Sequence, residues 1–109
     1  MPSALDEREK ATRVQAIRDG VRDLMPALTT YARQHDGRFV LFGSTASGDV
    51  RYDSDVDILV DFPLEAELDA WLFAEAQCFA RGLRPDIHVK AWRTDRFVAR
   101  VEHEGRILQ

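Results

Sequence analysis

Two aspartates interrupt an apolar stretch in the middle of the chain. Asp55 and Asp57 flank Val56 and are followed by further apolar residues at 58–60. Side chains alternate along a β-strand, so the two carboxylates project from one face while Val56 projects from the other. Carboxylates held together on a half-buried strand repel each other and lose solvation, and they therefore need a positive partner.

A third aspartate repeats this arrangement on a later segment. Asp86 alternates with apolar residues in the stretch 85–92 and shares one strand face with His88 and Lys90, which we assign to an exposed surface. If this segment neighbours the first, Asp86 lies beside the first two carboxylates. Divalent cations neutralise such a cluster, and Mg²⁺ bound by a few carboxylates usually takes water and substrate phosphates as its other ligands.

A phosphate-binding turn is indicated upstream of the acids. Gly43 and Ser44 directly follow a short apolar segment, and Gly48 closes the turn that they begin. A glycine lets the backbone approach a phosphate closely, and the serine hydroxyl with the following N–H groups can donate hydrogen bonds to phosphate oxygens. A Gly-Ser pair after a strand is common, and so is an Asp-x-Asp segment. Joined in this order with a third acid, they indicate phosphate transfer assisted by two metal ions.

The elements that must position these residues begin with a long amphipathic segment. Apolar residues spaced by three and four trace one helical face from Val14 to Tyr31, and Pro26 interrupts the series. This predicts either one kinked helix or two helices that meet near Met25. We interpret the apolar face as core packing, with a partner-binding surface as the second interpretation.

The remaining apolar segments predict a small sheet. Strands are expected at 38–42, 56–62 and 85–92, with a short terminal strand at 107–108. The segment 43–54 is a polar loop with room for one helical turn. Helices alternate with these strands, so the fold class is α/β (α+β), with a small mixed β-sheet flanked by helices.

Two further helices separate the strands. The first begins at Pro63 and ends at Gly82. Its apolar residues lie three or four apart and share one face: Leu64, Leu68, Leu72, Ala76 and Phe79. A final helix is capped by Thr94 and Asp95 and ends at Gly105.

Length and composition predict one small domain spanning residues 1–109. The chain has 109 residues, 45% hydrophobic and 31% charged, and its formal net charge of −4 lacks the basic footprint of bulk nucleic-acid binding. A single cysteine, Cys78, excludes an intrachain disulfide and favours a reducing compartment. Residues 1–13 lack the apolar core of a secretory signal, and no apolar run approaches the length of a membrane span. We expect a cytoplasmic protein without a membrane partner.

The acids and the turn together resemble a known signature. The segment GSTASGDVRYDSDVDILV, residues 43–60, resembles that of the DNA polymerase β-like nucleotidyltransferase superfamily, and the short chain resembles its minimal nucleotidyltransferase (MNT) family. The resemblance covers nearly the whole chain and implies a polymerase β-like nucleotidyltransferase fold. It also implies that Asp55, Asp57 and Asp86 are the catalytic acids and bind two Mg²⁺ ions.

The same resemblance assigns the turn to the nucleotide. It implies that Gly43 and Ser44 hold the triphosphate of the incoming nucleotide, for which ATP is the family's usual choice. Many members carry arginine before the second glycine of the loop, where this sequence has Ser47. Arg51 lies near in sequence and is a candidate replacement for that positive charge.

The resemblance further implies a reaction and a partner. Many minimal nucleotidyltransferases resemble antitoxins that move AMP from ATP onto a tyrosine of a HEPN-type toxin, so we predict a protein adenylyltransferase of a toxin–antitoxin pair. A catalytically weak or inactive binding module that neutralises its partner by contact is the first alternative, favoured by Ser47. A small-molecule nucleotidyltransferase is the second. The N-terminal apolar face and the C-terminal segment are candidate docking surfaces, and the oligomeric state stays open.

Overall fold

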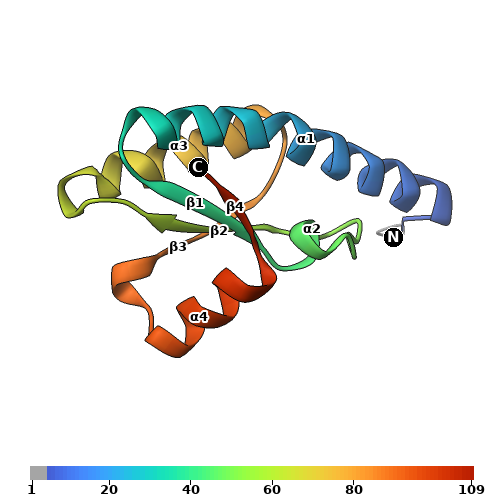
Figure 1. Cartoon of the computed structure of the whole chain (residues 1–109). Coiled ribbons are helices and arrows are strands. Elements are labelled where there is room, and N and C mark those ends of the chain that lie inside the picture. The colour runs from blue at the N-terminus through green and yellow to red at the C-terminus, as the bar shows by residue number, and fades with distance from the viewer. Residues whose placement is uncertain (1–4) are drawn as a thin grey trace.

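The computed structural model describes residues 5–109, and its centre is a four-stranded mixed sheet in the order β3-β2-β1-β4 (Figure 1). The strands are β1 Arg38–Phe42, β2 Val56–Asp61, β3 Pro85–Val89 and β4 Arg106–Leu108. β1 runs antiparallel to both β2 and β4, whereas β2 and β3 are parallel. The predicted mixed sheet flanked by helices is confirmed. β3 ends at Val89, earlier than predicted, because the chain turns there into a short 3-10 helix, η2 Lys90–Trp92.

Helices cover both faces of the sheet. α1 Glu7–Gln34 and α3 Glu67–Ala80 lie on one face, and α4 Asp95–Glu104 lies on the other (Figure 1). The short helix α2 Ser44–Ser47 follows β1, and the 3-10 helix η1 Leu64–Ala66 leads into α3. Among the helices of the described part of the chain, none combines the length and the apolar character that a membrane crossing requires.

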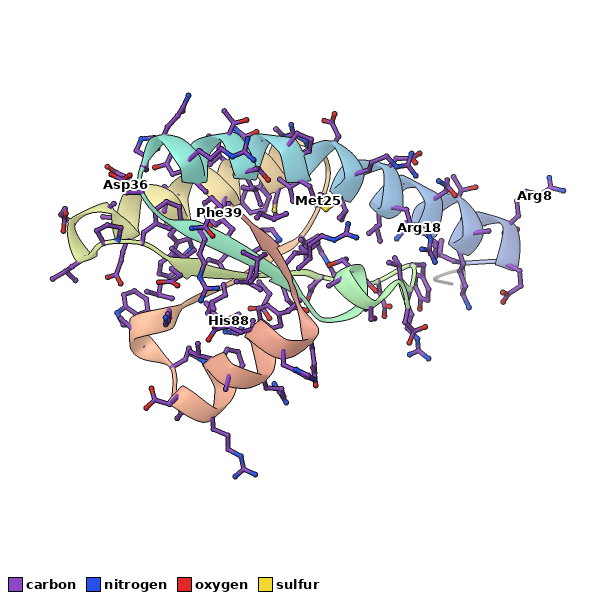
Figure 2. All side chains as sticks on the ribbon, in the orientation of Figure 1. Arg8, Arg18, Met25, Asp36, Phe39 and His88 are labelled. Carbon is purple, nitrogen blue, oxygen red and sulfur yellow. The ribbon has the colours of Figure 1, made fainter. Side chains whose placement is uncertain are left out.

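Strand alternation divides the core into two parts. Phe39 and Ile58 point toward α1 and α3, where they join the larger apolar cluster, and Figure 2 shows Phe39 beneath α1. Val40 and Leu59 point the other way and pack against Val98 and its neighbours on α4. The sheet is therefore covered by apolar packing on both faces.

α1 is one continuous helix, as the first of the two sequence interpretations allowed. The Asp6 carboxylate accepts a hydrogen bond from the Glu9 N–H at 2.8 Å and caps its first turn. Pro26 lies inside the helix with its ring on the exposed side. The face interpreted as core is buried where α1 crosses the sheet, as Leu24 and Leu28 are fully inaccessible.

The apolar stripe of α3 faces solvent, which the sequence did not reveal. The helix instead buries its small residues, Ala70, Ala74 and Cys78, against the sheet and α1. The stripe residues keep large exposed fractions: Leu64 80%, Leu68 64%, Leu72 52% and Phe79 62%. Apolar residues occur all round this helix, so periodicity alone could not tell which face is buried.

Two leucine truncations distinguish the buried face from the exposed one. Leu28→Ala should lower the free energy of unfolding by about 2–5 kcal/mol, because it leaves a cavity in the core. Leu72→Ala should change it by less than about 0.5 kcal/mol, because its side chain already contacts water. Urea denaturation followed by circular dichroism measures both. Equal losses for the two variants would contradict the described packing of α3.

Candidate active site

Two carboxylates from neighbouring strands meet near one end of the sheet. Asp57 of β2 is the direct register partner of Asp86 of β3, and on its other side it is paired with Phe42 of β1. Asp57, Asp86 and His88 each offer one ligand atom, and these three atoms lie within 4.8 Å of one another. The parallel pairing of β2 and β3 thus brings the second and third predicted acids together.

His88 belongs to this cluster, contrary to the exposed position assigned from the sequence. Its Nε2 lies 3.4 Å from Oδ2 of Asp86, and its side chain is only 19% exposed. The ring packs against Phe42 and Phe97, with centroids 5.4 Å apart in each case, and Figure 2 shows it between the sheet and α4. The strand pattern placed His88 on the face of Asp86, but the covering helix α4 was not visible in that pattern.

Asp55 lies beside the cluster but outside the group of three. It immediately precedes β2, and its Oδ1 lies 3.0 Å from Nη2 of Arg84, at the start of β3. The same guanidinium donates a hydrogen bond to the backbone carbonyl of Asp53. Arg84 therefore joins the loop before β2 to the segment before β3, and it supplies a positive charge that sequence reasoning did not identify.

The electrostatics of Asp57 favour its protonated form. Burial, a hydrogen bond with Asp86 and the negative charges of Asp86 and Asp55 raise the pKa of Asp57 from 3.8 to about 7. A bound cation would favour the ionised form instead, because it removes the like-charge repulsion. The carboxylates of Asp57 and Asp86 and the half-buried imidazole of His88 are common ligands of divalent cations, and carboxylates are the ligands that Mg²⁺ prefers. The donor set therefore fits a divalent metal held by Asp57 and Asp86, with Asp55 at its edge.

The Gly43–Ser44 turn lies directly against this cluster. Gly43 has a φ of +70°, and a Cβ at this position would collide with Oδ2 of Asp57. Glycine is thus required here both by the backbone conformation and by the close approach of the carboxylate. The Ser44 hydroxyl donates to Oγ of Ser54 at 3.1 Å, and that oxygen accepts the Arg51 N–H at 2.8 Å. The turn and the loop before β2 therefore form one connected unit.

Arginines from the helical side surround the loop. Arg18 of α1 donates to the Gly48 carbonyl at 3.1 Å, and Figure 2 shows its position on the helix above α2. A hollow of about 310 Å³ next to Ser54 is lined by Arg13 of α1 and by Arg84. Positive charge thus reaches the loop from α1 and from Arg84, the residue before β3, although Ser47 itself carries none.

A mixed sheet with a Gly-Ser turn after its first strand and acids on two neighbouring strands is the arrangement of a nucleotidyltransferase. The family model described as "Nucleotidyltransferase domain" matches residues 21–108, and the chain belongs to this family. The chain is also similar to a solved structure described as that of a "putative minimal nucleotidyltransferase", with a TM-score of 0.68 and 28% sequence identity. That match covers 82% of this chain and 93% of the other. A comparison with curated proteins finds no match.

The raised pKa of Asp57 predicts a pH-dependent stability. The folded state holds this proton more tightly than the unfolded chain, so the stabilisation is complete below about pH 4 and is lost as the pH rises through about 7. Asp57→Asn cannot titrate, and its free energy of unfolding relative to wild type should therefore rise between pH 4 and 7 and level off above pH 8. Urea denaturation in EDTA measures this difference.

The control for this titration is Asp53→Asn, which removes an exposed loop carboxylate near the same site. Comparison of the two variants separates the effect of Asp57 from the general effect of removing one carboxylate near the site. Parallel pH profiles for wild type and Asp57→Asn would show that folding leaves the pKa of Asp57 unchanged and would contradict the predicted rise.

Proposed function

We propose that this protein transfers AMP from ATP onto a hydroxyl group of a partner protein, in a reaction that requires Mg²⁺. The observation that carries the proposal is the pairing of Asp57 with Asp86 beside the backbone of Gly43. Membership of the nucleotidyltransferase family supports the reaction class. The net charge of −4 disfavours RNA as the acceptor, and the resemblance to minimal nucleotidyltransferases favours a tyrosine of a HEPN-type toxin, which gives this chain the role of an antitoxin.

One group of residues holds the nucleotide and its metal ions. Gly43 and Ser44 hold the β- and γ-phosphates through backbone N–H groups and the serine hydroxyl. Asp55, Asp57 and Asp86 bind two Mg²⁺ ions, which when bound neutralise the charge that develops on the phosphates. Oδ1 of Asp55 contacts Arg84, so Asp55 would bind the metal through Oδ2 or by giving up this contact.

The bond changes follow from the position of the acids. The acceptor oxygen forms a bond to the α-phosphorus, and the bond from that phosphorus to the bridging oxygen breaks, so that pyrophosphate leaves. Asp86 takes the proton of the acceptor hydroxyl. His88, 3.4 Å from Asp86 and held between Phe42 and Phe97, is a positioning residue that fixes the orientation of this carboxylate.

A binding module without catalysis is the second candidate. The observation that favours it is the ion pair between Asp55 and Arg84, which keeps one of the three acids out of the cluster. In that case the chain would neutralise its partner by contact alone. The two candidates differ in whether the partner gains mass.

Incubation with the partner separates these candidates. The protein encoded beside this chain should gain one or more AMP units when it is incubated with the chain, ATP and Mg²⁺, as measured by intact-protein mass spectrometry. The Asp57→Asn/Asp86→Asn variant should give no gain, and Asp53→Asn should match wild type. A stable complex without any mass gain would reject the enzyme and favour the binding module.

A pair of glycine substitutions tests whether the turn and the acids act as one site. Gly43→Ala forces a Cβ onto the Asp57 carboxylate, whereas at Gly48, which has a φ of +89°, no atom lies within 4 Å of the added Cβ. Both variants carry the strain of a positive φ, but only the first displaces the acid. Gly43→Ala should weaken Mn²⁺ binding, measured by electron paramagnetic resonance without nucleotide, at least about tenfold, while Gly48→Ala stays near wild type. Equal effects would separate the turn from the metal ligands.

A further inference from the structure

A continuous apolar surface on the outside of α3 is unexplained by the fold. We define the α3 patch as the exposed side chains Leu64, Leu68, Leu72, Phe79 and Trp92. Leu64 lies on η1, and Leu68, Leu72 and Phe79 follow on α3 at intervals of four, four and seven residues. These intervals return to the same side of a helix, so the side chains form one stripe. Single exposed apolar residues are ordinary, but a contiguous group of this size marks a binding surface.

One end of the α3 patch is hollowed. A depression of about 260 Å³ is lined by Leu64, Glu67, Leu68, Trp71, Val89 and Trp92. Trp71 and Trp92 meet edge to face, with ring centroids 5.5 Å apart, and Trp92 remains 65% exposed. Tryptophan is among the residue types enriched at the few positions that contribute most to binding at protein interfaces. The hollow has room for one large apolar side chain.

Acidic residues predominate along the α3 side of the patch. Glu65, Glu67, Asp69 and Glu75 lie on η1 and α3, and residues 62–80 contain no lysine or arginine. The basic residues nearest in the sequence to α3 and Trp92 are Arg81, Lys90 and Arg93, and each makes a contact outside the patch. The Arg93 guanidinium lies over the Phe97 ring of α4, 4.2 Å from its centroid. Arg81 pairs with Asp23 at 2.8 Å, and Lys90 pairs with Asp61 at 3.4 Å. The patch is therefore apolar at its centre and acidic at its rim.

We propose that the α3 patch docks a partner protein through an amphipathic helix whose apolar stripe is flanked by lysine and arginine. The straight stripe from Leu64 to Phe79 suits a second helix laid along it, and the acidic rim complements basic flanks. A second copy of this chain would place one acidic rim against another, and an anionic membrane surface would be repelled by the same residues. Charge complementarity thus selects a basic protein partner.

The docking surface is independent of the chemistry at Asp57 and Asp86. It rests on the proposed function in one respect, because the docked protein would be the acceptor. After α3 the chain passes through Gly82 into β3, which carries Asp86. Binding is therefore measured without ATP or metal. A failure to bind would reject the docking surface and leave nucleotidyl transfer untouched, while a failure to transfer would leave the docking surface standing.

Two matched peptides serve as probes. Both are 18-residue leucine-faced amphipathic helices with the same fluorescent label, one flanked by lysine and the other by glutamate. At 150 mM salt the lysine peptide should bind at least about tenfold more tightly than the glutamate peptide, as measured by fluorescence anisotropy, because its flanks complement the acidic rim. The tryptophan emission of the chain, which comes from Trp71 and Trp92 at the hollow, should shift on binding.

Surface variants locate the site. Leu68→Ser/Leu72→Ser should weaken binding of the lysine peptide at least about tenfold, because it removes the centre of the stripe. Ile107→Ser, which changes an exposed apolar residue on β4, is the matched control and should bind as wild type does. Both variants should keep the wild-type melting temperature.

Four outcomes would overturn the proposal. The first two are equal affinity of the chain for the two peptides and unchanged affinity of the Leu68→Ser/Leu72→Ser variant for the lysine peptide. The third is a dimer of the wild-type chain in sedimentation equilibrium that the variant does not form. The fourth is binding of the wild-type chain to phosphatidylserine vesicles that the variant has lost. The last two would assign the patch to a second copy or to a lipid surface.

Discussion

The parallel pairing of β2 with β3 is the constraint on which the site depends. It places Asp57 opposite Asp86 and brings two acids that are 29 residues apart in sequence into contact. Parallel strands need a crossover, and here η1 and α3 provide it. α3 contributes no ligand, but as the crossover it allows the two strands to pair in parallel and so to bring the acids together. The small residues Ala70 and Ala74 let α3 lie close to the sheet.

The acids are held together against their own repulsion. Burial on the α4 side of the sheet and the neighbouring negative charges oppose ionisation of Asp57, and the apolar packing around β1 and β2 must offset this cost. Gly43 allows its backbone to pack directly against the Asp57 carboxylate, which occupies the space that a side chain at this position would need. A carboxylate pair that opposes ionisation at neutral pH is suited to a divalent cation, whose positive charge would favour the ionised form of both acids.

Much of this could be predicted from the sequence, and the exceptions have physical reasons. Strand alternation placed the acids on one face, and the Gly-Ser turn and β1 were located correctly, since these signals are local. The role of His88 could not be predicted, because its burial depends on α4, which reaches that face only in the folded chain. The contact of Arg84 with Asp55 is likewise a consequence of tertiary structure. Both contacts, His88 with Phe97 and Arg84 with Asp55, join segments that are distant in the sequence, and local sequence patterns carry no information about such pairs.

The orientation of α3 is the most informative of these exceptions. In a helix with leucine, tryptophan, phenylalanine and alanine on several sides, burial of the larger residues would bring more apolar area out of water. The fold buries the alanines instead, because the β2–β3 crossover leaves space only for a closely packed helix. Leu68 and Leu72 then contribute little to folding, and folding does not explain why they are apolar. Leucine at such positions is expected to be retained for contact with another molecule, and the acidic residues beside it narrow the choice to a partner of opposite charge.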